Sequence, residues 1–171
     1  FSVPAKTFLD ASFSLTDPTT NSNGAFTYTS SNTAVATVSG TTITIVGGGS
    51  STITAVQAST AIYASATITS SLVVSKATTV LTDFSVPAKT FGNAPFTITA
   101  PTTNGNGAFT YTSSNTAVAT VSGTTITIVG GGSSTITANQ ATTTNYTSGT
   151  ITASLVVSQA TPTITYSIPA K

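Results

Sequence analysis

Polar and apolar residues alternate with a period of two along most of this chain. In Phe26-Thr27-Tyr28-Thr29 the aromatic side chains fall on one face and the threonines on the other, and Thr42-Ile43-Thr44-Ile45 repeats the pattern. Such alternation is typical of β-strands with one buried face. In the first half of the chain it predicts about seven strands, near residues 2–8, 12–16, 25–30, 34–39, 41–46, 50–57 and 65–76.

Turn residues separate the predicted strands. Ser39-Gly40 indicates a tight hairpin because glycine adopts positive φ at little cost, and Gly47–Gly49 marks the next reversal. Pro4 and its counterpart Pro87 lie inside the first predicted strand of each half. A proline removes a donor from the hydrogen-bond ladder, so we expect this strand to lie at a sheet edge and to be broken or bulged at the proline.

The chain repeats itself. Phe1–Phe8 returns as Phe84–Phe91, and Asn23–Ala55 is identical throughout to Asn106–Ala138. A third copy opens with Tyr166-Ser167-Ile168-Pro169-Ala170-Lys171. A period of roughly 80 residues is too long for a solenoid repeat and matches one small domain with its own core.

We therefore predict two domains and the opening of a third. Their bounds are 1–76, a repeat lacking its opening residues, 77–159, a full repeat, and 160–171, the first strand of a truncated repeat. Short, evenly spaced strands with one apolar face favour two antiparallel sheets packed face to face, an immunoglobulin-like β-sandwich. The predicted core of the first repeat is Val3, Phe8, Phe13, Leu15, Phe26, Tyr28, Val35, Val38, Ile43, Ile45, Ile53, Tyr63, Ile68, Leu72 and Val74.

Composition agrees with an all-β protein and excludes several kinds of chemistry. Threonine and serine dominate, hydrophobic residues make up 39%, and the mean hydropathy is +0.32, so a packed core is available. Cys, His, Met, Trp, Arg and Glu are absent, which excludes disulfides, thiolate metal sites and imidazole catalysis. Four lysines and three aspartates give a net charge of +1, too little for nucleic-acid binding. We also expect no membrane insertion, since no apolar run is long enough to span a bilayer.

Two segments of the first repeat resemble a known family. Tyr28–Gly40 (YTSSNTAVATVSG) and Thr42–Ala55 (TITIVGGGSSTITA) are similar to the signature of group 2 bacterial immunoglobulin-like domains, the invasin and intimin type. Asn145-Tyr146, with Ile62-Tyr63 in its place in the first repeat, continues the match. The resemblance implies tandem domains of large surface adhesins, phage tail fibres or large algal virus proteins, which extend and present other domains and share no catalytic or binding residue.

Enzymatic and covalent chemistry has little support in the sequence. Without His or Glu, only Lys or Asp is available as a base for a hydroxyl nucleophile. The acids are not repeated, because Asp10 and Asp17 become Asn93 and Ala100. An intramolecular isopeptide bond would pair Lys6 with Asn32 and Lys89 with Asn115, but it needs a buried carboxylate; we expect instead that both lysines are solvated edge-strand charges. We predict no catalytic, cofactor-binding or metal-binding residue, and no cofactor.

Three further hypotheses concern the surface. Calcium binding needs converging carboxylates, which three scattered aspartates do not supply. Thr-x-Thr pairs at 27/29, 42/44, 52/54 and 67/69 suggest the hypothesis of an ice-binding face. Such a face needs a flat array, and we expect these pairs to be divided between two twisted sheets. The same hydroxyls offer sites for O-glycans, and Asn145-Tyr146-Thr147 is the one N-glycosylation sequon. Tyr63 and Tyr146 are expected to be packed rings with the hydroxyl bonded to backbone.

Our functional expectation is a non-catalytic spacer or stalk of a long repeat protein at an extracellular, cell or virion surface. Its partners would be neighbouring repeats of the same chain, copies of itself in a fibre, and a host or cell-surface glycan or receptor bound through other domains. Two alternatives stay open. In the first alternative, the chain is a filament subunit joined by strand complementation through 160–171. In the second, it is a glycan- or receptor-binding module that uses the loops that differ between copies, such as Ser59–Ala64 against Thr142–Thr147.

Overall fold

A computed structural model describes residues 1–167 of the chain. Within that range all regular secondary structure is β-strand, sixteen strands in total. None of the described residues forms a helix long and apolar enough to cross a membrane. The all-β fold class expected from the alternating pattern is confirmed.

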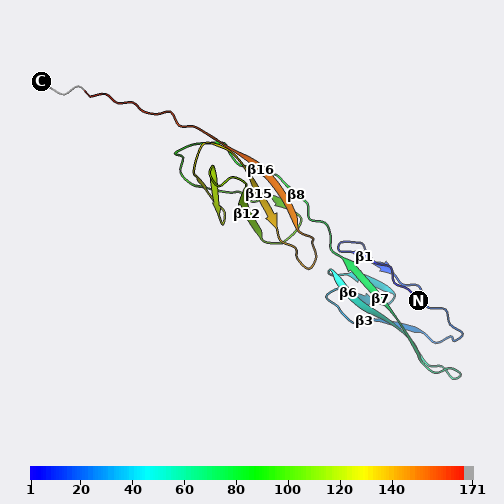
Figure 1. Cartoon of the computed structure of the whole chain (residues 1–171). Coiled ribbons are helices and arrows are strands. Elements are labelled where there is room, and N and C mark those ends of the chain that lie inside the picture. Colours follow the sequence, from blue (N-terminus) through cyan, green and yellow to red (C-terminus); the bar gives the residue numbers. More distant parts are fainter. Residues whose placement is uncertain (168–171) are drawn as a thin grey trace. The chain divides into compact units, whose positions relative to one another are not determined.

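The chain divides into two compact units that do not follow the sequence repeat strictly. The first unit comprises Phe1–Thr79 together with Gly105–Gly107 and Thr142–Ser148. The second comprises Val80–Asn104, Ala108–Ala141 and the described residues from Gly149 onward. Figure 1 colours both units along the sequence. A loop encoded in the second repeat therefore belongs to the first unit.

The first unit is a sandwich of a four-stranded and a three-stranded sheet. The larger sheet has the order β1 (Lys6–Thr7), β7 (Ala66–Ser75), β6 (Gly49–Gln57), β3 (Phe26–Ser30). The smaller has the order β2 (Phe13–Ser14), β5 (Thr42–Ile45), β4 (Ala36–Ser39). Each of these strands lies within its predicted range, except that β6 begins one position earlier, at Gly49. In the larger sheet Tyr28 lies opposite Ala55, and Ala55 lies opposite Ile68.

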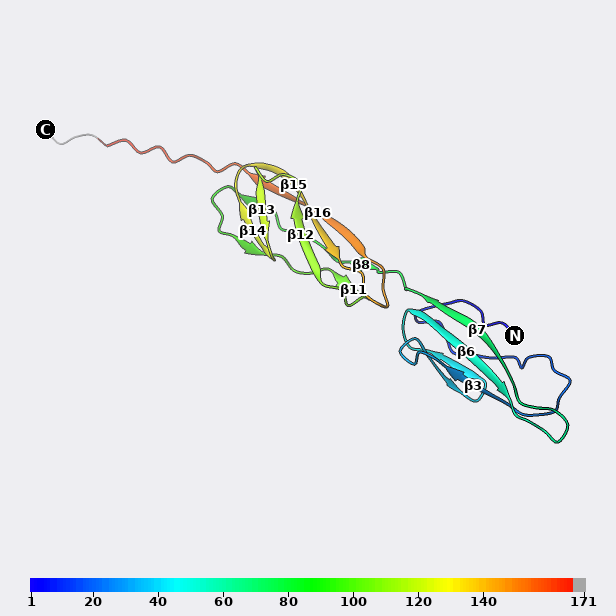
Figure 2. The ribbon, with the colours of Figure 1, turned by 60° about the horizontal axis from the view of Figure 1, so that its bottom comes forward.

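The second unit repeats these two sheets and adds a small strand pair, as the second view shows (Figure 2). Its larger sheet has the order β12 (Phe109–Ser113), β15 (Gly132–Gln140), β16 (Gly149–Ser158), β9 (Lys89–Thr90). Its smaller sheet has the order β10 (Phe96–Thr97), β14 (Thr125–Ile128), β13 (Ala119–Ser122). The added pair is β8 (Leu81–Thr82) with β11 (Thr102–Thr103).

The first strand of the first unit is short and lies at a sheet edge, as the internal proline predicted. β1 begins only after Pro4, and Val3 donates its amide to the Ser70 hydroxyl at 3.1 Å instead of to a strand partner. One feature differs from the expected antiparallel sandwich: β1 pairs with β7 in parallel, as β9 does with β16. This orientation is open to β1 because it is not joined to β7 by a hairpin; the chain continues from β1 into the opposite sheet.

The core lies between the two sheets of each unit. Its fully buried large side chains are Ile43, Ile53 and Leu72 in the first unit and Ile126, Ile136 and Leu155 in the second. Two predicted core residues are wrong. Ile68 is 43% exposed because the short strands of the opposite sheet cover only the C-terminal half of β7. Tyr63 is 39% exposed because it lies on the loop between β6 and β7, beyond the sandwich.

Two buried polar side chains hold the loops of the first unit. Ser51 Oγ lies 2.8 Å from Ser30 Oγ and accepts the Asn32 amide at 3.0 Å. Gln57 donates to the carbonyls of Ser22 and Gly24 at 3.2 and 3.0 Å, and so fixes the long loop before β3. Because burial without partners would be costly, these bonds are needed for the loops to close over the core.

Candidate functional site

The lysines and asparagines considered for a covalent cross-link have separate partners. Lys6 Nζ lies 4.6 Å from the centre of the Phe13 ring, and Lys89 Nζ lies 4.5 Å from that of Phe96. The Asn32 side-chain oxygen accepts the Ala34 amide at 3.1 Å within a turn. The lysines do lie on edge strands as expected, but each ammonium group covers an aromatic ring, and each lysine is only half exposed to solvent.

The three aspartates do not converge. Asp10 accepts the Thr7 amide at 2.8 Å, Asp83 accepts the Thr82 hydroxyl at 2.8 Å, and Asp17 accepts the Tyr28 hydroxyl at 2.5 Å. Among residues 1–167 no group of three or more potential metal ligands of the Asp, Glu, His or Cys type occurs. Each carboxylate therefore serves a local structural bond.

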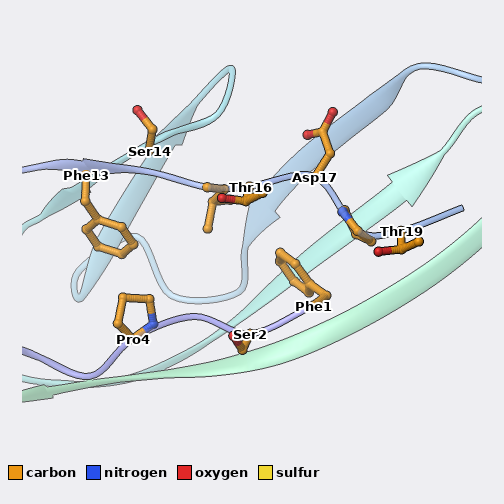
Figure 3. Close-up of a pocket in the computed structure, with 10 residues that line it drawn as sticks. Phe1, Ser2, Pro4, Phe13, Ser14, Thr16, Asp17 and Thr19 are labelled. Atoms are coloured by element: carbon orange, nitrogen blue, oxygen red, sulfur yellow. The ribbon is translucent and has the colours of Figure 1, made fainter.

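A shallow hollow near the start of the chain lies beside Tyr28, whose pKa is perturbed. Figure 3 shows the rings of Phe1, Pro4 and Phe13 lining the hollow, with the Asp17 carboxylate pointing away from Phe1. Burial, the hydrogen bond to Asp17 and the charge of Asp17 raise the pKa of Tyr28 to about 12. The raised pKa keeps the phenol protonated, so it acts as a structural hydrogen-bond donor and not as a base.

The threonine pairs form a hydroxyl-rich face on the larger sheet. Three of the four pairs lie on β3, β6 and β7, and 42/44 lies on the smaller sheet. Thr29 is opposite Thr54, which is opposite Thr69, so these side chains form one cross-strand row. The pairs are thus divided between two sheets as expected, but unequally, because the β3, β6 and β7 segments are neighbours in one sheet.

The most specific site in the described chain is a loop bound in a socket within the first unit. The loop is Thr142–Ser148, which joins β15 to β16, and its tip is a tight turn. The Thr143 amide donates to the Tyr146 carbonyl at 3.0 Å, and the Tyr146 amide donates to the Thr143 hydroxyl at 3.1 Å. Threonine suits this position because its hydroxyl replaces a backbone acceptor in a turn.

The main chain of this loop pairs with the segment that follows β7. The Ala77 amide donates to the Asn145 carbonyl at 2.9 Å, and the Thr147 amide donates to the Ala77 carbonyl at 3.0 Å. Thr79 adds two more bonds: its amide donates to the Thr147 hydroxyl at 3.1 Å, and its own hydroxyl donates to the Thr147 carbonyl. Ala77 and Tyr146 thereby form a parallel bridge.

Side chains complete the binding of the loop. Asn145 Oδ1 accepts the Gly48 amide at 2.9 Å, and the Tyr146 ring meets the Phe8 ring edge-on at a centroid distance of 5.6 Å. A Cβ on Gly48 would lie well inside van der Waals contact with the Thr144 carbonyl oxygen, so only glycine fits. We call Phe8, Gly47, Gly48, Lys76 and Ala77 the loop socket of the first unit.

Sequence reasoning found part of this site. Tyr146 was expected to be a packed ring, and it is half-buried against Phe8. Gly47–Gly49 were expected to be turn glycines, but Gly48 is required for the close approach of a distant loop. The available signal was a run of three glycines, longer than one reversal needs. Asn145 of the sequon is half-buried, and its side-chain oxygen is already bonded to Gly48.

Comparisons with known proteins give only distant similarities. No protein-family model matches the sequence, and no curated protein matches it. Among solved structures, the chain is similar to human protocadherin-24 EC1-2, at 13% identity and a TM-score of 0.36 over 94% of this chain and 95% of that one. It is also similar to domains 4 and 5 of the S-layer protein SbsC (22%, 0.34, over 78% and 70%) and to the endo-fucoidan hydrolase MfFcnA4 (13%, 0.37, over 94% and 28%). TM-scores this low do not select a function.

Proposed function

We propose that this chain is a non-catalytic structural segment, a spacer or stalk, of a long extracellular repeat protein of the adhesin or fibre type. The proposal rests on one observation. Each unit has its own buried core, and the residues that leave β7 are hydrogen-bonded at Ala77 and Thr79 instead of forming a free linker. Self-supporting sandwiches with an ordered connecting segment are suited to extend and present other domains.

The placement of polar groups supports a role without catalysis. The hydroxyls gather on a sheet face, while the aspartates and Lys6 are engaged in local contacts. Lys76 donates to the Thr142 hydroxyl at 3.0 Å, and in the second repeat its place is taken by Gln159. The finer assignment, to the group 2 bacterial immunoglobulin-like type at a cell or virion surface, is part of the same proposal and rests on the sequence resemblance.

Force spectroscopy of the chain held between two handles tests the spacer role. Extension should give two separate unfolding events, because each unit has its own core. Each event should release on the order of 25 nm, since a unit of about 80 residues reaches about 3.5 Å per residue when extended. A chain that stretches without discrete events, or that binds glycans reproducibly on an array, would contradict the spacer role.

A second candidate, a filament subunit joined by strand complementation, is favoured by a specific observation. Ile164 and Tyr166 are 91% and 87% exposed, although Ile164-Thr165 corresponds in the repeat to Leu81-Thr82 of β8. In the first unit Thr19-Thr20, the counterpart of β11, lies outside any strand. Residues 168–171 of the predicted third-repeat strand lie outside the described range. Ending the chain at Thr161 and measuring its mass in solution tests this candidate, since an unchanged monomer excludes it.

A further inference from the structure

The last strand of each repeat meets the same partner surface in its sheet. Nine residue pairs join β6 to β7, and nine pairs at the equivalent positions join β15 to β16. β6 and β15 differ in sequence at one position only, Val56 against Asn139. The side chains that β7 and β16 bury between the sheets are also the same, Leu72 and Val74 against Leu155 and Val157. Each of the two strands is therefore able to pair with the other's neighbour without losing contacts.

The remaining neighbours do not distinguish the two strands either. β1 pairs with β7, and β9 pairs with β16, in parallel and at equivalent positions. In the opposite sheets, the identical segments Asn23–Ala55 and Asn106–Ala138 carry β4 and β5 in one repeat and β13 and β14 in the other. Exchange of strands between neighbouring domains is a characteristic failure of repeat proteins, and here almost nothing in the sandwiches opposes it.

We propose that the chain has a second folded state in which β7 and β16 exchange places. In this exchanged state β16 completes the sandwich of β1 to β6, and β7 completes the sandwich of β9 to β15. The connections 58–65 and 141–148 then run from one sandwich to the other, and each spans on the order of 30 Å when extended. Residues 76–88 join the end of β7 to β9, at the cost of the β8–β11 pair. The inference goes beyond the spacer role and does not depend on it.

The loop socket favours the unexchanged state. Gly48 lies just before β6 and stays with β1 to β6, whereas Ala77 follows β7 and leaves with it. After the exchange, no position of the loop Thr142–Ser148 makes both sets of bonds, the one from the Gly48 amide to Asn145 Oδ1 and those to the Ala77 main chain. The strands are too alike to discriminate between the two states. The loop and its socket, together with the small β8–β11 pair, therefore select the strand pairing.

Pairs of introduced cysteines distinguish the two states, because the chain has no cysteine of its own. Thr54 lies opposite Thr69 in the larger sheet, and in the exchanged state it lies opposite Thr152. The Cβ atoms of directly opposite residues are about 4.5–5.5 Å apart, close enough for a disulfide after a small adjustment. Thr54→Cys/Thr152→Cys therefore reports the exchanged state, and Thr54→Cys/Thr69→Cys reports the unexchanged one. Thr54→Cys/Thr112→Cys is the control for chance collisions, because β6 and β12 belong to different sandwiches in both states.

In the experiment the full chain is held at the midpoint of its urea transition, where the sandwiches open and reform, and is then refolded and oxidised. Peptide mass spectrometry of the monomer gives the fraction joined by each disulfide. Adding Gly48→Ala to Thr54→Cys/Thr152→Cys should raise the linked fraction at least about fivefold, the ratio that corresponds to 1 kcal/mol. Asn145→Ala, which weakens the loop without touching its socket, should raise it as well. Gly131→Ala should leave it unchanged, since the nearest atoms there belong to Gln159 and Val157 and not to the bound loop.

A shorter connection tests the route of the exchange. Gln57 lies directly opposite Ala66, so replacing residues 58–65 by Asn-Gly still joins β6 to β7 in a tight hairpin. Two residues are too short to carry β7 into the other sandwich. The Thr54→Cys/Thr152→Cys link should then fall to the control background, while the Thr54→Cys/Thr69→Cys link should form as before.

The proposal is overturned if, with Gly48→Ala present, the Thr54→Cys/Thr152→Cys link is no more frequent than the control link. A link that joins two molecules, or one that survives the short connection, would overturn it as well. Equal linked fractions with Gly48→Ala and with Gly131→Ala would refute the selecting role of the loop. None of these results affects the spacer function, because the exchanged state also has two cores and unfolds in two events.

Discussion

Adding one methyl group at Gly48 measures how strongly the bound loop stabilises the first unit. The Cβ of Gly48→Ala would overlap the Thr144 carbonyl oxygen, which is main chain and cannot rotate away. Relieving the overlap moves the loop away from its socket. The contacts at risk are the two main-chain bonds to Ala77, the Gly48 to Asn145 bond and the Tyr146 ring contact.

The magnitude follows from these contacts. Each hydrogen bond contributes about 0.5–1.5 kcal/mol net, and an edge-on ring pair contributes about as much. The loss is partial because the loop shifts without unfolding, and replacing glycine with alanine restricts the unfolded chain by about 0.4–1 kcal/mol in the opposite sense. We expect Gly48→Ala to lower the free energy of unfolding of the first unit by about 1–3 kcal/mol, a fall in Tm of roughly 5–20 °C for a domain of this size.

Gly131→Ala is the matched control, since it places the same group in the same local sequence. Among the described residues no loop lies against Gly131 as Thr144 lies against Gly48. In Gly131→Ala the free energy of unfolding of the second unit should therefore stay unchanged or rise by up to about 1 kcal/mol. Urea denaturation followed by circular dichroism gives both values, and hydrogen exchange at Asn145 and Thr147 reports release of the loop. Equal stability changes in the two variants would refute the assignment of Gly48 to loop binding.

Three further predictions concern the first unit. Because the pKa of Tyr28 is raised to about 12, the protonated phenol stabilises the folded state fully below about pH 10. This stabilisation should be lost as the pH rises toward 12, by at most roughly 3 kcal/mol. Asp17→Asn should reduce the loss, as measured by melting curves at a series of pH values. Gln57→Ala removes the side-chain donor from two half-buried carbonyls, so urea denaturation should show a loss of free energy of unfolding of about 1 kcal/mol. Ile43→Ala should cost about 2–5 kcal/mol, whereas Ile68→Ala, on the half-exposed part of β7, should cost less than about 1 kcal/mol; equal costs would contradict the observed core.

The strands of this protein could be predicted from sequence because their signals are local. Alternation at period two and the glycine turns located β3 to β7 closely, and Pro4 correctly indicated a broken edge strand. Burial was predictable where a strand is covered along its length, as at Ile43. It failed at Ile68, because the alternating pattern gives the face of a strand but not the extent of the sheet packed against it.

The sequence by itself determined the alternation, the turns and the internal repeat, and with them an all-β chain of two similar sandwiches. Only the tertiary structure decided which identical residues are buried. Gly48 and Gly131 have the same neighbours in sequence, yet one lies beneath a loop and the other faces solvent. The physical reason is that a contact between segments far apart in the chain depends on the placement of both, and a local pattern describes only one.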